Sequence, residues 1–368
     1  MYKICDLPPL GFNNQNNICY LNSFLQLLFS CDIFDDIEIS FEINECHRIN
    51  KLNGTLLEIE DESLMGEKYI NQKISYDYRY IIKKILFEKL LDYCVEIYLF
   101  YKNREIEPDK NLSIVLSKIL NILSTSIVHG QQQDVTEAFF VLINSLDIEH
   151  KIFFRYYEIL SCGINDKETY RFKQENKTSY IEFLVNEYYG DDRISESYLA
   201  DFILDTYTYI PDYICEICET RCNVKKQRII SFIPDNIFIY VVRSSVDDLD
   251  MNLIFPPTFN INSSYGYISK YELTGVVNYS ANVSSSSYGI SQSSGHYQCT
   301  VIRNGIVFNC NDNVVKIDQS KSYIITDNHC IFLYYKKIKE CYNDDYKFEV
   351  SKELYGFEYE YRHTYTEP

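Results

Sequence analysis

The sequence predicts an α+β protein in which a helical first part is followed by a strand-rich second part. Up to about residue 150, apolar residues recur with the three- and four-residue spacing of amphipathic helices. Beyond that point, short runs rich in Tyr, Ile, Phe and Val are separated by Asn, Asp, Ser, Gly and Pro, as is typical of strands and turns. The chain has 368 residues, of which 46% are hydrophobic, so it can form one large domain with sub-lobes or two domains.

The charge and the cysteine count restrict the function classes. A net charge of −18 argues against nucleic-acid binding, because phosphates are neutralised by Lys and Arg. An acidic surface suits a partner with a basic face, although it also serves solubility alone. Thirteen cysteines, an odd number, do not fit a secreted disulfide framework. The first residues lack the apolar run of a signal peptide. No stretch approaches the roughly 18 apolar residues of a membrane span.

We therefore expect an intracellular protein, cytoplasmic or nuclear, or in the same compartments of a host cell if the protein is viral. Its cysteines should be mostly free and buried. Binding to membranes is not expected.

The first predicted helix begins near residue 19. Its apolar residues follow the spacing i, i+3, i+4, i+7, i+8, namely Leu21, Phe24, Leu25, Leu28 and Phe29. Asn16 or Asn17 is the candidate N-cap, which places Cys19 in the first turn. There the free N–H groups and the helix dipole favour thiolate, the reactive form of cysteine. Position alone favours a buried cysteine that has no role.

The remaining elements follow from the same patterns. Residues 33–75 are acidic with weak periodicity, and residues 79–127 are predicted to be helical. Another helix follows Gln133, with apolar residues on one face at Val135, Ala138, Phe139, Leu142, Ile143 and Leu146. Strands are predicted at residues 236–242, 271–277, 297–302 and 330–335. The Ser-rich residues 280–294 are predicted to form a flexible loop.

A sequence box surrounds Cys19. Residues 11–23 read Gly-Phe-Asn-Asn-Gln-Asn-Asn-Ile-Cys-Tyr-Leu-Asn-Ser, and Leu25-Gln26 follow. This run resembles, without gaps, the Cys box of ubiquitin-specific proteases, roughly Gly-Leu-x-Asn-x-Gly-Asn-Thr-Cys-Tyr-Met-Asn-Ser-x-Leu-Gln. The resemblance implies that Cys19 is the nucleophile and that the Asn14 amide stabilises the oxyanion. Asn16 replaces the family's Gly, and Ile18 replaces its Thr, which should only alter packing.

A second box contains one of the six histidines. Gly295-His296-Tyr297 resembles the family's Gly-His-Tyr box. The resemblance implies that His296 is the general base and acid and that Gly295 and Tyr297 contact the substrate. Tyr279 stands where the family often has a His, and the Ser-rich insertion follows it.

The third member of the triad is expected near residue 311. The run from Phe308 to Val315 resembles the family's segment that ends in Asp-Asp-x-Val-Val. Aligned on the two valines, Asn311 would orient the imidazole through its carbonyl oxygen, and Asp312 would assist with its charge. An ordinary Asn and Asp turn is the alternative.

Residues 131–139 resemble the family's Gln-Gln-Asp-x-x-Glu-Phe box. The resemblance implies that Gln133, Asp134 and Glu137 bind the substrate's C-terminal tail, because carboxylates suit its Arg residues. Asp134 and Glu137 lie three apart at a helix start and share a face. The alternative is an acidic pair that only favours the helix dipole.

The motif Cys215-Glu216-Ile217-Cys218 resembles the second half of the family's zinc ribbon. Zinc requires four tetrahedral ligands, but the first half supplies only Cys162. Asp166 or Cys222 could be the fourth ligand, or the site has decayed. Any zinc would be structural, and catalysis would need no cofactor.

The resemblance, from Gly11 to about Lys336, implies a papain-like cysteine protease fold forming one catalytic domain over residues 1–368. A helical thumb would span about residues 1–155, fingers 156–230 and a β-rich palm 231–368. The function implied is a deubiquitinase that hydrolyses the bond after ubiquitin's C-terminal Gly through a thioester. Its partners would be ubiquitin and ubiquitinated proteins, and we expect a monomer. The alternatives are an inactive ubiquitin-binding pseudoenzyme and a protease for another ubiquitin-like modifier.

Overall fold

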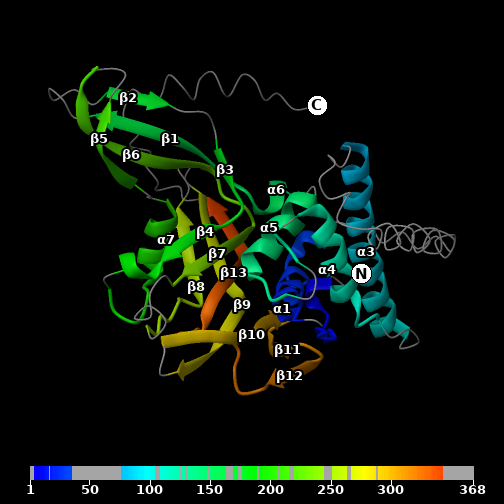
Figure 1. Ribbon diagram of the computed structural model, residues 1–368. Helices are drawn as coiled ribbons and strands as arrows, with labels where there is room; N and C mark the ends of the chain where they lie inside the picture. Colours follow the sequence, from blue (N-terminus) through cyan, green and yellow to red (C-terminus); the bar gives the residue numbers. More distant parts are fainter. Residues whose placement is uncertain are drawn as a thin grey trace.

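The fold is described by a computed structural model (Figure 1). The residues that it describes are 4–15, 17–34, 76–103, 108–124, 126–128, 131–146, 149–162, 169–172, 176–188, 190–204, 207–214, 219–243, 251–262, 267–286 and 289–342. The predicted acidic stretch at residues 33–75 lies almost entirely outside this set.

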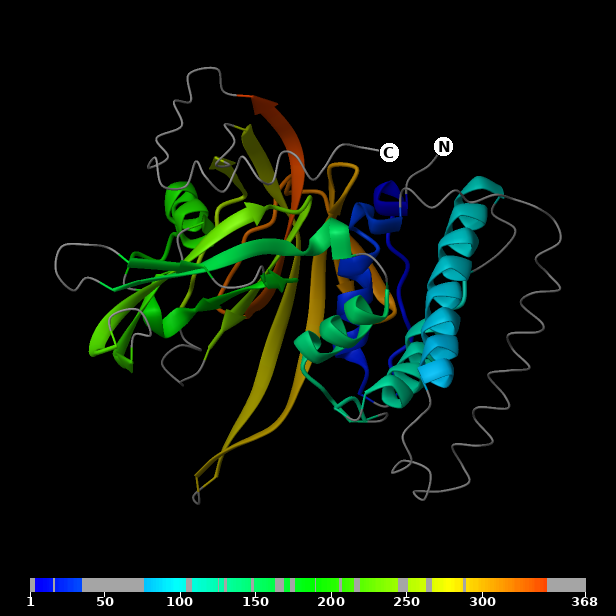
Figure 2. The same cartoon turned by 90° about the horizontal axis from the view of Figure 1, so that it is seen from above.

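Helices dominate the first part of the chain. They are η1 (Ile4–Asp6), α1 (Cys19–Leu28), η2 (Asp32–Phe34), α3 (Tyr76–Asn103), α4 (Leu112–Leu123), α5 (Val135–Ser145) and α6 (Glu149–Ile152). The predicted helices at residue 21, within residues 79–127 and after Gln133 are thus confirmed. Every residue of α1 is buried, because α1 lies between the other helices and the large sheet (Figure 2).

The large sheet has eight strands in the order β12-β11-β10-β9-β13-β7-β4, with β8 paired to β9. They are β4 (Ile181–Leu184), β7 (Asn236–Val242), β8 (Thr258–Asn262), β9 (Tyr267–Ser286), β10 (Gly289–Arg303), β11 (Ile306–Asn311), β12 (Val314–Asp318) and β13 (Cys330–Tyr342). Strands β4 and β7 pair in parallel, and the other described strand pairs of this sheet are antiparallel. The four predicted strands lie within β7, β9, β10 and β13 and are confirmed.

The smaller sheet projects from the body (Figure 1). Its strands are β1 (Phe154–Cys162), β2 (Thr169–Phe172), β3 (Asn176–Thr178), β5 (Tyr207–Ile214) and β6 (Arg221–Phe232). Their order is β2-β1-β6-β5, with β3 paired to β1. Between the strands lie η4 (Val185–Glu187) and α7 (Glu196–Leu204), a helix that the sequence analysis did not predict. The predicted lobe limits near residues 155 and 230 stay predictions.

The prediction of a flexible loop at residues 280–294 was wrong. Strands β9 and β10 stay paired from His296 opposite Ser280 out to Gly289 opposite Ser286, with one irregularity between Gln292 and Ser294. They form a long hairpin that extends from the body (Figure 2). The reason is that backbone N–H and C=O groups form the ladder whatever the side chains are. A Ser-rich composition therefore does not exclude strand pairing.

Aromatic rings join the helices to the sheet. Phe139 of α5 lies with its ring centroid 5.6 Å from that of Phe24 on α1, 5.0 Å from Phe238 on β7 and 5.2 Å from Phe332 on β13. All four residues belong to one buried cluster. Phe thus supplies the large apolar area in a chain without Trp. This packing fixes α1, and with it Cys19, against the sheet. Within the described ranges, no helix has the length and apolar character needed to cross a membrane.

Candidate active site

Cys19 is the first residue of α1, and only 3% of it is exposed. The backbone N–H of Tyr297 on β10 acts on its thiol and lowers the thiol's pKa. The residue before Tyr297 is His296, so this contact brings the predicted nucleophile and the predicted base to one place. The two come from distant parts of the sequence, and α1 against β10 is the packing that joins them.

The N-terminus of α1 differs from the prediction. Its N-cap is Ile18, which makes no side-chain cap hydrogen bond, so the assignment to Asn16 or Asn17 was wrong. Instead, Asn14 Oδ1 accepts a hydrogen bond of 3.1 Å from the backbone N–H of Ile18. Asn17 takes the left-handed conformation, with φ of 59°, which Asn tolerates better than most residues. Asn16 lies outside the described residues, and Ile18 is fully buried.

The pKa of Cys19 is raised above its ordinary value. Burial is the main cause, because it disfavours the charged thiolate. The N–H of Tyr297 opposes this effect, and the negative charge of Asp312 adds to it. The expectation that the helix start would favour thiolate is therefore corrected: burial outweighs the helix N-terminus. A base must accordingly take the thiol proton during the reaction.

His296 lies beside the predicted third members. Its Nε2 is 2.7 Å from Asn311 Oδ1 and 3.8 Å from Asp312 Oδ2. Asn311 ends β11, which pairs with β10, and Asp312 follows in the tight connection to β12 with φ of 49°. Because Asn311 Oδ1 can only accept, Nε2 carries the proton in this pair, and Nδ1 is left with a lone pair.

Asp312 is held by two amides. Its Oδ2 accepts a 2.8 Å hydrogen bond from Asn14, and its Oδ1 accepts one of the same length from Asn22 on α1. The backbone N–H of Phe12 also donates to Asp312 O at 3.0 Å. Asp312 thus fastens the loop before Cys19 to the strand pair that carries the imidazole. The sequence analysis did not predict Asn22 as a site residue, although an amide side chain in a largely apolar helix was a signal for it.

Gln132 is a second residue that the sequence analysis missed. Its Nε2 lies 4.0 Å from Cys19 Sγ and 2.7 Å from Gly295 O. The amide of its neighbour Gln133, which was predicted to bind substrate, faces two acceptors, Ser126 O and Glu137 Oε2; with its nitrogen turned toward them it donates at 3.2 Å and 3.0 Å. Three glutamines stand in a row in the sequence, and no local pattern tells which of them reaches the thiol.

The two predicted acidic residues lie at the start of α5. Asp134 is the N-cap, and its Oδ1 accepts a 2.8 Å hydrogen bond from Thr136 N, so it serves the helix. Its Oδ2 lies 3.4 Å from the Tyr240 hydroxyl. Glu137 is in the first turn, where burial and then Asp134 raise its pKa. Burial, and then the negative charge of Asp134, also raise the pKa of Tyr297 on β10.

Gly295 is packed against Tyr279, the residue that stands in place of the family's His. A Cβ added to Gly295 would collide with the Tyr279 hydroxyl and ring. The Tyr279 ring in turn lies 4.7 Å from that of Tyr297, between centroids. The close approach of Tyr279 therefore requires glycine before His296.

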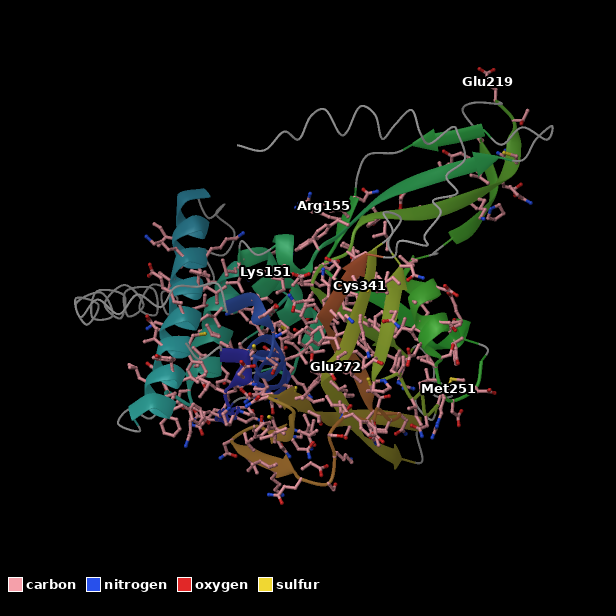
Figure 3. The ribbon with its side chains drawn as sticks, turned by 180° about the vertical axis from the view of Figure 1, so that it is seen from behind. Lys151, Arg155, Glu219, Met251, Glu272 and Cys341 are labelled. Carbon is pink, nitrogen blue, oxygen red and sulfur yellow. The ribbon has the colours of Figure 1, made fainter. Side chains whose placement is uncertain are left out.

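The predicted zinc ligands are only partly described. Cys215, Cys218 and Asp166 lie outside the described residues, as does the side chain of Cys162. Cys162 pairs with Val224 across β1 and β6, two residues from Cys222, and Ile214 pairs with Arg221. The topology therefore brings Cys162, Cys222 and the residue before Cys215 to the tip of the small sheet, near Glu219 and far from Arg155 at its base (Figure 3). In the described part of the chain, no three His, Cys, Asp or Glu side chains cluster as metal ligands. The zinc site stays a prediction.

The chain is similar to a known protein family and to several solved structures. Residues 10–335 match the family model described as ubiquitin carboxyl-terminal hydrolase. Among solved structures, the Ubp8 module of the SAGA complex bound to monoubiquitin is similar, with a TM-score of 0.60 and 15% identity. The alignment covers 92% of this chain and 71% of that one.

The same module bound to ubiquitin aldehyde aligns with a TM-score of 0.59 and 16% identity, over 92% of this chain and 71% of that one. A yeast SAGA deubiquitinase module has a TM-score of 0.56 and 15% identity, over 92% and 70%. A comparison with curated protein sequences finds no match. At these identities the structural likeness supports the fold, and the predicted α+β, papain-like class is confirmed.

Proposed function

The chain belongs to the ubiquitin carboxyl-terminal hydrolase family and is a cysteine-type deubiquitinase, and we propose that Cys19, His296 and Asn311 form its catalytic triad. The observation that carries this proposal is the 2.7 Å contact between His296 Nε2 and Asn311 Oδ1. It fixes the ring so that Nδ1 is available as a base next to the Tyr297 N–H that acts on the Cys19 thiol. Catalysis in this family needs no cofactor.

The reaction proceeds in two halves. The Cys19 thiol gives its proton to His296 Nδ1 as Sγ attacks the carbonyl carbon of ubiquitin's C-terminal Gly. The tetrahedral oxyanion is stabilised by the backbone N–H of Cys19 and by Asn14, whose Nδ2 has a second N–H besides the one bonded to Asp312. The C–N bond then breaks, and the leaving amine takes the proton from His296.

A thioester remains on Cys19 after the first half. Water attacks its carbonyl carbon and gives a proton to His296, and the second tetrahedral intermediate collapses. The thiol leaves and recovers that proton, and ubiquitin departs with a free carboxylate. Burial raises the pKa of the Cys19 thiol, which favours proton transfer to His296 as Sγ attacks.

The substrate tail would lie along the carboxylates of the α5 start. Asp134 and Glu137 supply negative charge there, and Gly295 and Tyr297 line the β10 side. Gln133 supports Glu137 through its amide. We propose that ubiquitin and ubiquitinated proteins are the partners, and that the protein acts in a reducing intracellular compartment. Free cysteines among the described residues, such as Cys31 and Cys299, support the latter.

A ubiquitin-binding pseudoenzyme is the second candidate. The exposure of Cys19 is only 3%, so the thiol of this conformation is poorly accessible to a carbonyl. The paired imidazole and the intact nucleophile favour an active enzyme over this reading. A protease for another ubiquitin-like modifier would use the same triad and differ only in the tail contacts.

The test uses ubiquitin that carries a C-terminal fluorogenic amide. We expect the wild-type protein to release the fluorophore and Cys19→Ala to release none while still binding ubiquitin. Absence of release by the wild type with ubiquitin bound would contradict the enzyme and support the pseudoenzyme. Release of the fluorophore from the amide of another ubiquitin-like modifier, but not from that of ubiquitin, would show that the other modifier is the substrate.

A further inference from the structure

The Gln132 amide bridges the two sides of the site. Gln132 precedes α5 in the sequence, but its side chain bonds to the backbone of Gly295 on β10. Its Nε2 donates to Gly295 O at 2.7 Å, and its Oε1 accepts from Gly295 N at 3.4 Å. Pairing of β10 with β11 covers Cys299 to Arg303 only. Gly295 lies beyond that stretch, so its N–H and C=O are available to a side chain.

This two-point pairing fixes the plane of the Gln132 amide. One N–H of Nε2 is used by Gly295 O, and the other is left for a different acceptor. Nε2 lies 4.0 Å from Cys19 Sγ. The oxygen of a tetrahedral adduct on Cys19 forms close to Sγ, and a donor must stand about 2.7–3.1 Å from that oxygen to stabilise it. A donor fixed at this separation from the sulfur can meet the requirement without rearranging.

Asn14 is engaged differently. Its Nδ2 donates to Asp312 at 2.8 Å, and its Oδ1 accepts from Ile18 N. Both polar atoms therefore brace the loop before Cys19, and the second N–H of Nδ2 stays available to the oxyanion. Gln132, by contrast, directs its Nε2 at Cys19 Sγ from 4.0 Å.

We propose that Gln132 is a catalytic residue that donates its free Nε2–H to the oxyanion formed on Cys19. This inference rests on the proposed function, because it assigns a role within the same reaction. The residue stabilises charge only once the carbonyl oxygen becomes negative, so it lowers the barrier without adding to ubiquitin affinity. No proton leaves the amide, and Gly295 acts as the positioning partner that holds it.

The experiment compares Gln132→Ala and Gln132→Glu with wild type. The Glu variant keeps the size and an acceptor for Gly295 N but has no N–H to donate at neutral pH. Gln131→Ala is the matched control, because Gln131 is an exposed glutamine in the same run and is bonded through its backbone N–H to Val128 O. Thermal unfolding of each variant checks that it is folded. The substrate is ubiquitin with a C-terminal fluorogenic amide.

We expect both Gln132 variants to lose kcat by on the order of 10²-fold, with little change in the affinity for ubiquitin measured in the Cys19→Ala background. Their affinity for ubiquitin aldehyde, whose adduct with Cys19 places an oxygen at the oxyanion position, should fall by more than their affinity for ubiquitin. Alkylation of Cys19 by iodoacetamide, a reaction without an oxyanion, should change far less than kcat.

Two results would overturn the inference. If wild type and Gln132→Ala turn over equally, Gln132 is no donor, although the deubiquitinase function stands. If Gln132→Ala binds ubiquitin more tightly and turns it over faster, the residue closes the cleft instead of assisting the chemistry. Absence of turnover by the wild type would contradict the proposed function itself.

Discussion

Asn311 Oδ1 lies 2.7 Å from His296 Nε2, whereas the nearer carboxylate oxygen of Asp312 lies 3.8 Å from the same atom. The neutral amide, not the carboxylate, therefore orients the imidazole. The two carboxylate oxygens of Asp312 instead accept hydrogen bonds, one from Asn14 and one from Asn22. The two neighbouring residues thus make separate contacts: Asn311 holds the His296 ring, and Asp312 holds the loop before Cys19.

Substitutions at residue 311 should test the first contact. Asn311→Ala removes the acceptor that fixes Nε2, so we expect kcat on the fluorogenic ubiquitin amide to fall by on the order of 10²-fold, with a smaller change in KM. Asn311→Asp keeps an acceptor oxygen and adds charge that stabilises the imidazolium, so it should retain activity. Equal kcat in wild type and Asn311→Ala would show that Asn311 has no orienting role.

The pH dependence of Cys19 alkylation should test the charge of Asp312. Thiolate is the reactive form, so a raised pKa moves the midpoint of the rate profile to higher pH than that of an exposed cysteine. Because the negative charge of Asp312 contributes to the rise, Asp312→Asn should lower the pKa and move the midpoint to lower pH. The comparison is made in a His296→Ala background, where the imidazole does not titrate, by mass analysis of the Cys19 peptide after iodoacetamide treatment. A midpoint that moves to higher pH would contradict this assignment.

Gly295 and Tyr279 offer a test of close packing. Gly295→Ala places a Cβ where the Tyr279 ring stands, and we expect a loss of about 1–3 kcal/mol in the free energy of unfolding. It should also lower kcat by displacing the carbonyl that holds Gln132. Adding Tyr279→Ala removes the obstacle, so the double variant should recover stability relative to Gly295→Ala. Independent, additive effects of the two substitutions in chemical denaturation would rule out the clash.

Much of this site could be predicted from the sequence because its residues lie in short, continuous sequence motifs. The helix after Cys19 follows from apolar spacing, and His296, Asn311 and Asp312 follow from short sequence boxes, one within β10 and one at the end of β11. The rest depends on contacts across the fold. Gln132 differs from Gln131 and Gln133 only in which one faces Gly295, and Asn22 gains its role from Asp312, 290 residues away. The paired strands through residues 280–294 escaped prediction because their ladder is formed by backbone atoms, on which side-chain patterns carry no information.

Arg303 should be the main anchor of α1 and is open to a direct test. It is 2% exposed, and its guanidinium donates to Ser30 Oγ at 3.0 Å, to Leu7 O at 3.1 Å and to Gln26 O at 3.0 Å. The Gln26 carbonyl belongs to the last turn of α1, where a cation is favourable and carbonyls lack partners within the helix.

Arg303→Met should remove all three hydrogen bonds and leave the buried Leu7 O without its donor, at about 1–3 kcal/mol, while Ser30 Oγ still donates to Gln26 O at 2.7 Å. Arg303→Lys keeps the charge but lacks the planar fork, so its loss in the free energy of unfolding should be intermediate. Lys321→Met, on the exposed turn after β12, is a control that removes a cation without burial. If urea unfolding gave the same midpoint for Arg303→Met and Lys321→Met, the guanidinium would not be the group that anchors α1 to β10. The position of Cys19 would then depend on the apolar packing around Phe24 and Phe139 alone.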